Sequence, residues 1–420
     1  MTAYLNIFEW KYYSLAALLF IILFSLAINR ATFITKSFLL STAIWLAPLY
    51  YITFIIFQNA TNFPVILALI TESCILITWL RILWVLMNRL AAVEQSDLAI
   101  LSSWLNKSIL IQAAATGYFA MQPNFGIFSD GSRIEYLEGS RLNIYITYIS
   151  ALAAGAAAPV AAAVINIRKK WDKRAVAYMI LVLLGSLLSG SKGIGVLILI
   201  AVLCYVRIPD IKIYRKIVLA PVLIAVLFSL ATVIVVGSYL KLEPNDMADL
   251  MLNRIFLAND GRALAIDLSD QLHSPNISLF QESFRAYFSA VGFPPLNGPL
   301  GHLLYQLAFS SDTVNGANTS ATALMIAYGS GMEKMAFFLV LMVVVFSVYM
   351  FSQGGGKYSI LRLSVAVILL SLLSQDLLAF QVTLHLIILI TLLLFVFKRL
   401  LPRSARQDHR GEINEAGIRL

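Results

Sequence analysis

Long apolar runs, separated by short polar connections, dominate the amino-acid sequence. About 20 consecutive apolar residues are needed for a helix to cross a bilayer, so each run predicts one membrane span. We expect an all-α polytopic membrane protein with about eleven transmembrane helices, near residues 13–28, 37–57, 63–87, 107–121, 143–167, 175–190, 193–206, 217–237, 334–351, 359–380 and 383–397.

Composition supports this reading. Of the 420 residues, 60% are hydrophobic and only 13% are charged, about half the charged share of an average soluble domain. Such a chain cannot cover its own surface in water, which excludes a soluble enzyme. Cys74 and Cys204 lie within apolar runs, where cysteine is a small buried residue rather than a disulfide partner or metal ligand.

The basic connections between the spans predict how the chain is oriented across the membrane. Lysine and arginine concentrate in cytoplasmic loops of membrane proteins, and alternating spans put six basic segments on one side. That side is expected to be the cytoplasm, with the carboxy terminus inside. The net charge of +9 is explained in this way, without a nucleic-acid partner. The segments contain Arg30 and Lys36, Arg89 and Lys107, Arg168–Arg174, Arg207–Lys216, Lys357, and Lys398–Arg410.

One outside connection is far longer than the others, at residues 238–333. It divides the chain into helices one to eight (1–237), a long periplasmic loop with amphipathic helices (238–333), helices nine to eleven (334–397) and a basic tail (398–420). A connection of this length is usually functional or disordered. Phe280, Phe284 and Phe288 recur every four residues, which predicts one aromatic helix face. That face suits either the membrane interface or packing against the bundle.

Positive side chains are unexpectedly frequent on the outer side, against the usual topological bias. Arginine pairs with phosphate oxygens through two parallel hydrogen bonds. The set therefore favours binding of an anion such as a lipid-linked diphosphate, although single members also suit contacts with lipid head groups. The set comprises Arg133, Arg141, Lys192, Lys241, Arg254, Arg262 and Arg285.

Other polar residues of the outer segments could contact a sugar or a transferred proton. Asn315 and Asn318 suit either sugar hydroxyls or helix capping before the short apolar segment 321–331, which is either re-entrant or the outer half of span nine. Asp260 and Glu282 are candidate general bases. No metal-ligand spacing is present, so we expect no metal and no cofactor. The turn at 188–195 is rich in glycine and serine, but it lacks the spacing of a nucleotide-binding loop.

Glu72, Arg81 and Asp376 are ionisable residues within the predicted spans. Ionisable groups inside a membrane are functional candidates by default. Glu72 and Arg81 are nine residues apart and therefore face different sides of one helix, so we expect no direct pair.

This layout resembles the Wzy-type O-antigen and enterobacterial-common-antigen polymerases, which are similar to GT-C-type membrane glycosyltransferases. Four features carry the resemblance: an arginine-containing outer segment, a small-residue turn between central spans with lysine in place of the usual arginine, a late and long outer loop with a proline-rich centre, and a polar stretch before span nine. They are Phe128–Arg133, Ser189–Lys192, Gly292–Pro299, and Asn315–Thr322 leading into Tyr328–Gly331.

The resemblance implies polymerisation of undecaprenyl-diphosphate-linked oligosaccharide repeat units at the periplasmic face of a bacterial inner membrane. Partners would be the lipid-linked donor and acceptor, the bilayer and a chain-length regulator. Arg254, Arg262, Arg285, Asp260 and Glu282 would then serve catalysis. Substrate would contact Arg133, Arg141, Lys192, Asn315, Asn318, His302 and Tyr305.

Two other functions remain open at this stage. An O-antigen ligase shares the layout and the lipid donor but transfers to the lipid A core, and a histidine such as His302 in the outer loop would favour it. A transporter or flippase for lipid-linked sugars would instead use Glu72, Arg81 and Asp376 along a path, but the long outer loop and the absence of an inverted repeat argue against it.

Overall fold

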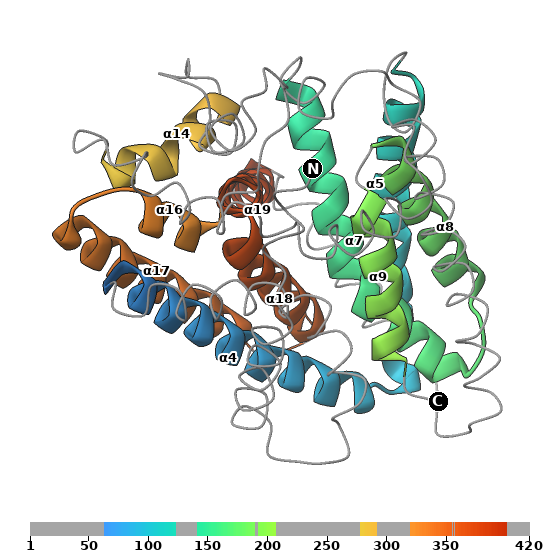
Figure 1. Cartoon of the computed structure of the whole chain (residues 1–420). Coiled ribbons are helices and arrows are strands. Elements are labelled where there is room, and N and C mark those ends of the chain that lie inside the picture. Colours follow the sequence, from blue (N-terminus) through green and yellow to red (C-terminus); the bar gives the residue numbers. More distant parts are fainter. Residues whose placement is uncertain are drawn as a thin grey trace, which may run out of the picture.

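A computed structural model describes residues 63–122, 141–189, 192–206, 278–291, 320–354, 356 and 358–400. Every regular element in these ranges is a helix (Figure 1). Four helices are long and apolar enough to cross a membrane, at Phe63–Ala91, Gln95–Ala120, Leu142–Arg168 and Gly331–Ser352. The chain is therefore an α-helical membrane protein.

One group of helices contains α5 (Leu98–Ala120), α7 (Arg141–Arg168), α8 (Lys173–Leu188) and α9 (Lys192–Tyr205). Helix α5 packs against α7 and α8, and α9 packs against the same two helices. The alanine-rich middle of α7 is buried, because small residues let helix backbones approach closely in a membrane.

A second group contains α4 (Phe63–Ala91), α17 (Gly331–Ser352) and α18 (Ser359–Gln375). Helices α4 and α17 run side by side, and α18 packs against both α4 and α7, which joins the two groups (Figure 1). Gly155 of α7 faces α18 so closely that an added Cβ would lie 2.7 Å from Cδ1 of Ile368.

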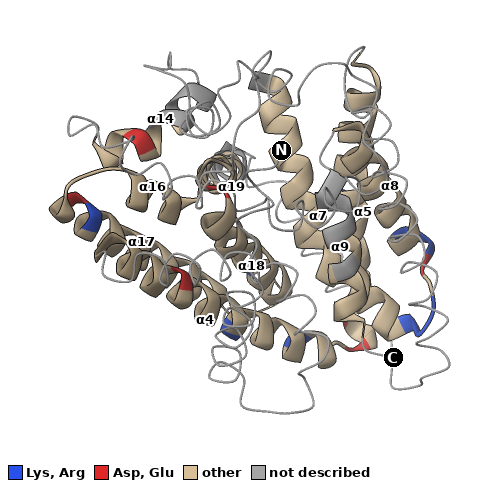
Figure 2. Cartoon of the chain, in the orientation of Figure 1, with Lys and Arg blue, Asp and Glu red and all other residues tan. Residues whose placement is uncertain are grey.

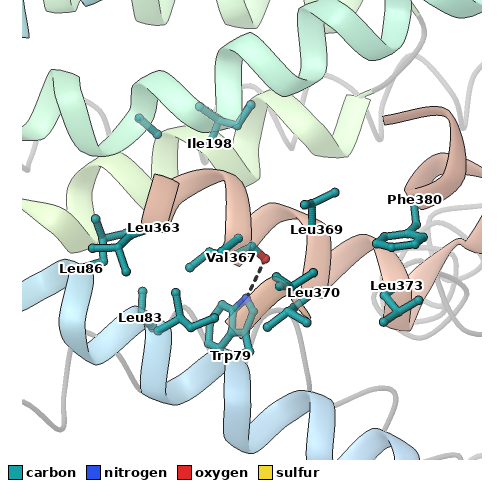
Figure 3. Close-up of a cluster of buried hydrophobic side chains, with 14 of the residues drawn as sticks. Trp79, Leu83, Leu86, Ile198, Leu363, Val367, Leu369, Leu370, Leu373 and Phe380 are labelled. Carbon is teal, nitrogen blue, oxygen red and sulfur yellow. Dashed lines mark hydrogen bonds between the residues drawn. The ribbon is translucent and has the colours of Figure 1, made fainter. Parts of the chain in front are cut away.

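The core between α4 and α18 is centred on Trp79, which is fully buried among leucines of both helices (Figure 3). Its indole Nε1 donates to the Val367 carbonyl oxygen at 3.1 Å and to Ser371 Oγ at 2.9 Å. A buried indole requires such an acceptor. Helix α18 supplies both acceptors, and the Ser371 hydroxyl in turn donates its own hydrogen to the Val367 carbonyl oxygen.

Three further elements complete one end of the structure: α14 (Leu279–Val291), the short α16 (Ala321–Ala327) and α19 (Leu377–Leu400). All seven residues of α16 are buried. Helix α14 packs against α16, α17 and α19. In Figure 1 these contacts place α14 at the top of the molecule, away from the lower ends of α4 and α7.

Eight of the eleven predicted apolar spans coincide with described helices, and the spans at 13–28, 37–57 and 217–237 lie outside the described residues. Within the segment 321–331, residues 321–327 form the separate buried helix α16, and α17 begins at Gly331. The predicted boundary between the last two spans was misplaced: α18 ends at Gln375 and α19 begins at Leu377, because Asp376 adopts an extended conformation.

Candidate functional site

Most residues proposed from the sequence lie outside the described part of the chain, so their roles stay predictions: Arg133, Arg254, Asp260, Arg262, His302, Tyr305, Asn315 and Asn318. Arg141 and Lys192 are the first residues of α7 and α9, and Arg285 lies within α14. Glu282 is half-buried in the first turn of α14, where a carboxylate is favoured by the helix dipole.

Helix α14 is one of the described parts of the long polar segment 238–333, and it is docked on the bundle. The ring of Phe280 packs edge-on against Phe337 of α17, with centroids 5.6 Å apart. Just before the helix, Ser278 Oγ donates to Glu333 Oε1 at 2.8 Å. The aromatic face expected here therefore serves packing at Phe280. Phe284 of the same face is 42% exposed.

Two polar contacts tie α14 to α19. Gln381 Nε2 donates to the Ser283 carbonyl oxygen at 2.8 Å. The Tyr287 hydroxyl lies 2.8 Å from His385 Nδ1, and either group can donate, according to the imidazole tautomer. The ring of Tyr145, from α7, lies 6.5 Å from that of His385. Three helices thus meet at one imidazole.

An open groove of about 290 Å³ runs beside these contacts, between α14 and α19. Its polar lining residues are Tyr287, Gln381 and His385, and the other lining residues are apolar. Gln381 Oε1 is buried and accepts no hydrogen bond from the described residues, which costs about 1–3 kcal/mol when uncompensated. The groove is lined by Phe284, Tyr287, Gln381, Leu384, His385, Ile388, Leu389 and Leu392.

A second polar cluster surrounds Glu72, whose side chain is fully buried in α4. Glu72 Oε1 accepts from Thr322 Oγ1 of α16 at 2.8 Å, and Oε2 accepts from Ser374 Oγ of α18 at 2.7 Å. The carboxyl group thereby joins three helices that are distant in sequence. Burial of such a group is tolerated only with hydrogen-bond donors of this kind.

Both ends of α16 are held by polar side chains. At its start, Ser320 Oγ accepts from the Ala323 amide at 3.1 Å and lies 3.0 Å from Thr322 Oγ1. At its end, buried Lys334 donates from Nζ to the Ile326 carbonyl oxygen at 3.1 Å. A cation is favoured beside the carbonyl groups that end a helix. Capping, one of the two roles considered for the polar stretch before span nine, is therefore the role of Ser320.

The other ionisable residues of the spans have separate surroundings. Arg81 is exposed on α4, whereas Glu72 is fully buried, so the two do not face each other, as expected. Asp376 Oδ1 accepts from the Ala379 amide at 3.0 Å in the first turn of α19. Described charges otherwise gather near helix ends, notably at the turn between α7 and α8, where Arg168 and Asp172 form a 2.7 Å ion pair (Figure 2).

Tyr287, Gln381 and His385 were not singled out from the sequence. A signal existed, because Gln381 and His385 are four residues apart within an apolar run and polar side chains inside a membrane span are functional candidates. Tyr287 gave no comparable signal, since its partner is 98 positions away. Among the described residues, no group of three His, Cys, Asp or Glu side chains could hold a metal ion.

Comparison of the chain with protein-family models, with curated proteins and with solved structures found no match.

Proposed function

We propose that the protein is a membrane glycosyltransferase that polymerises undecaprenyl-diphosphate-linked oligosaccharide repeat units at the periplasmic face of a bacterial inner membrane. The observation that carries the proposal is the docking of α14. This helix belongs to the long arginine-containing segment, and it is fixed to the membrane bundle through Phe280, Ser283 and Tyr287. A lipid-linked substrate requires polar groups held at such a membrane boundary.

The distribution of charge agrees with an outer location of α14. The basic ends of α4 and α7, with Arg89 and Arg168 in their last turns, lie at the bottom of the view in Figure 1, and α14 lies at the top. Under the positive-inside rule the basic ends face the cytoplasm. Residues 278–291 would then face the compartment in which repeat units are joined.

In the proposed reaction, a hydroxyl oxygen of the acceptor unit attacks the anomeric carbon of the donor. The bond from that carbon to the diphosphate oxygen breaks, and the lipid diphosphate leaves with the bonding electrons. The hydroxyl proton passes to a carboxylate, for which Asp260 and Glu282 are the candidates. Arg254, Arg262 and Arg285 would stabilise charge on the leaving diphosphate, the usual task of positioned cations.

Deletion of the gene distinguishes this function from the two alternatives. Loss of a polymerase leaves single repeat units on the lipid A core, whereas loss of an O-antigen ligase leaves long chains on the carrier lipid. Loss of a flippase or transporter leaves lipid-linked units on the cytoplasmic leaflet. We expect the first result, and either of the others would refute the proposal.

Single substitutions then test the diphosphate contacts. Arg254→Ala, Arg262→Ala and Arg285→Ala should each shorten the surface polysaccharide. Removing one transition-state donor commonly lowers kcat by about 10²–10³-fold. Arg174→Ala is the matched control, because Arg174 is exposed at the start of α8, next to the Arg168–Asp172 pair. Normal chain lengths in all three arginine variants would remove the diphosphate-binding role.

A further inference from the structure

The turn between α7 and α8 carries concentrated positive charge on a fixed backbone. Helix α7 ends at Arg168 and α8 begins at Lys173, and residues 168–173, here called the basic turn, contain four Lys or Arg side chains and a single acid. That acid, Asp172, is 4% exposed. Its Oδ2 pairs with Arg168 Nη1 at 2.7 Å, and its Oδ1 accepts from the Arg174 amide at 2.9 Å. One carboxylate therefore ties the end of α7 to the start of α8.

Two lysines of the basic turn keep their charge uncompensated. Lys169 and Lys170 are exposed, and neither pairs with an acid among the residues that the structure describes. Trp171, the next residue, is half-buried and packs against the central hydrophobic core. Figure 2 shows the colour of Lys and Arg concentrated where α7 and α8 are joined. Because the indole and Asp172 hold the turn in shape, the lysines are positioned for a negatively charged ligand before it binds.

Lys169 has a backbone conformation that favours a different residue. Its φ is 52°, in the left-handed region, and it directly follows the last residue of α7. Glycine is the usual residue at that position, because it has no Cβ to collide with the backbone. Lysine therefore strains the turn, and strain retained at an exposed position points to a function of the side chain.

The basic turn lies where a membrane span ends. Leu142–Arg168 is one of the helices long and apolar enough to cross a bilayer, so the residues after Arg168 leave the hydrocarbon and reach the lipid head groups. Tryptophan is enriched at this level of a membrane, which agrees with Trp171. Anionic phospholipids present a dense layer of negative charge there, and clusters of about four or more Lys or Arg beside a span are attracted to it.

We propose that the basic turn binds anionic phospholipid head groups of the leaflet that it faces. The ammonium groups of Lys169 and Lys170 contact the head-group phosphates, while Trp171 and Asp172 hold the turn in place. The bound lipids would fix the junction of α7 and α8 at the membrane surface. This inference does not depend on the proposed polymerase activity, because it concerns only charge at one helix junction.

The test titrates the purified full-length protein, in a neutral detergent, with phosphatidylglycerol or with zwitterionic phosphatidylcholine, and counts bound lipids by native mass spectrometry. Lys169→Gln combined with Lys170→Gln should weaken phosphatidylglycerol binding by about 25-fold, roughly fivefold for each lysine. Phosphatidylcholine binding should not change. The matched control is Arg89→Gln combined with Lys107→Gln, which removes the same charge from two exposed positions of α4 and α5. We expect this control to bind phosphatidylglycerol as wild type does.

Lys169→Gly tests the same contact without endangering the fold of the turn. Glycine relieves the left-handed strain, so the thermal unfolding midpoint in lipid-free detergent should be unchanged or higher. Phosphatidylglycerol binding should nevertheless weaken by about fivefold. A lysine with only a structural role would change the midpoint and leave lipid binding unaltered.

Three results would overturn the proposal. The first is unchanged phosphatidylglycerol binding in both turn variants. The second is an equal loss in the control, which would show attraction by net charge alone. The third is displacement of the lipid by inorganic phosphate at equal concentration, which would show a site for a free anion. None of these measurements uses polymer synthesis, so this inference and the proposed function fail separately.

Discussion

The hydrogen bonds of buried Glu72 give the sharpest test of how the bundle is held together. Glu72→Ala removes the acceptor for Ser374 Oγ at 2.7 Å, and Ser374→Ala removes the donor. Each single substitution also changes the free energy of unfolding in other ways, for example through the cavity left at position 72. A double-mutant cycle cancels these effects and isolates the energy of the pair.

The expected coupling follows from the burial of both groups. Glu72 is fully buried and Ser374 is 1% exposed, so water cannot replace either partner in the native state. Hydrogen bonds between membrane helices average about 0.6 kcal/mol, with a maximum near 1.7 kcal/mol. A carboxyl acceptor stands at the strong end of the range for hydrogen bonds. We therefore expect a coupling of about 1–2 kcal/mol, a factor of roughly 5–30 in the unfolding equilibrium.

Reversible unfolding in mixed micelles, followed by circular dichroism, would measure the four free energies of the cycle. Ser364 supplies the control, because it lies on the same helix and is 2% exposed, but its hydroxyl donates to its own helix at the Ile360 carbonyl oxygen, 2.7 Å away. Glu72→Ala combined with Ser364→Ala should be additive. The reasoning would be refuted if the Ser374 cycle gave no larger coupling than the Ser364 cycle.

Three other substitutions test the packing and polar contacts by their effect on the unfolding midpoint. Gly155→Leu should destabilise the protein by about 1–3 kcal/mol, because the new side chain would overlap Ile368. Its control, Gly117→Ala, has no atom within 4 Å of the added Cβ and should be neutral or stabilising. Equal effects of the two substitutions would contradict the close approach of α7 to α18. Trp79→Phe should cost about 1–2 kcal/mol through the two lost indole hydrogen bonds, and an unchanged midpoint would argue against them. Lys334→Met leaves the last turn of α16 without its buried donor and should cost about 1–3 kcal/mol; no loss would show that this contact contributes nothing.

Apolar run length was enough to locate eight of the described helices, because lipid requires each backbone to satisfy its own hydrogen bonds. The break between α16 and α17 was not predicted, although Gly329 and Gly331 flank Ser330 in the sequence; in the structure Gly329 has a φ of 84°. The break at Asp376 was placed some residues too late. Leu377 to Phe380 are as apolar as the end of α18, so run length could not show where the helix direction changes.

The polar contacts were much less accessible to sequence reasoning. Glu72 stood out as a lone carboxylate in an apolar run, but its partners Thr322 and Ser374 are 250 and 302 positions away. Hydroxyl groups are common in membrane helices and carry no pattern of their own. Tyr287 and His385 likewise meet only because α14 docks on α19. Which side chains meet is decided by helix packing, which local periodicity does not encode.

The contacts of α14 and α16 constrain the segment that carries several predicted substrate contacts. Helix α14 ends at Val291 and α16 begins at Ala321, and both are packed against each other and against the bundle. The two helices that flank residues 292–319 are therefore held by the bundle, and fixed ends lower the entropic cost of closing a chain segment around a ligand. A substitution that releases the start of α16, such as Thr322→Val, should weaken any substrate contact made by this connection even though position 322 is buried. Sugar binding and the Glu72 hydrogen bonds would then be coupled through one short helix.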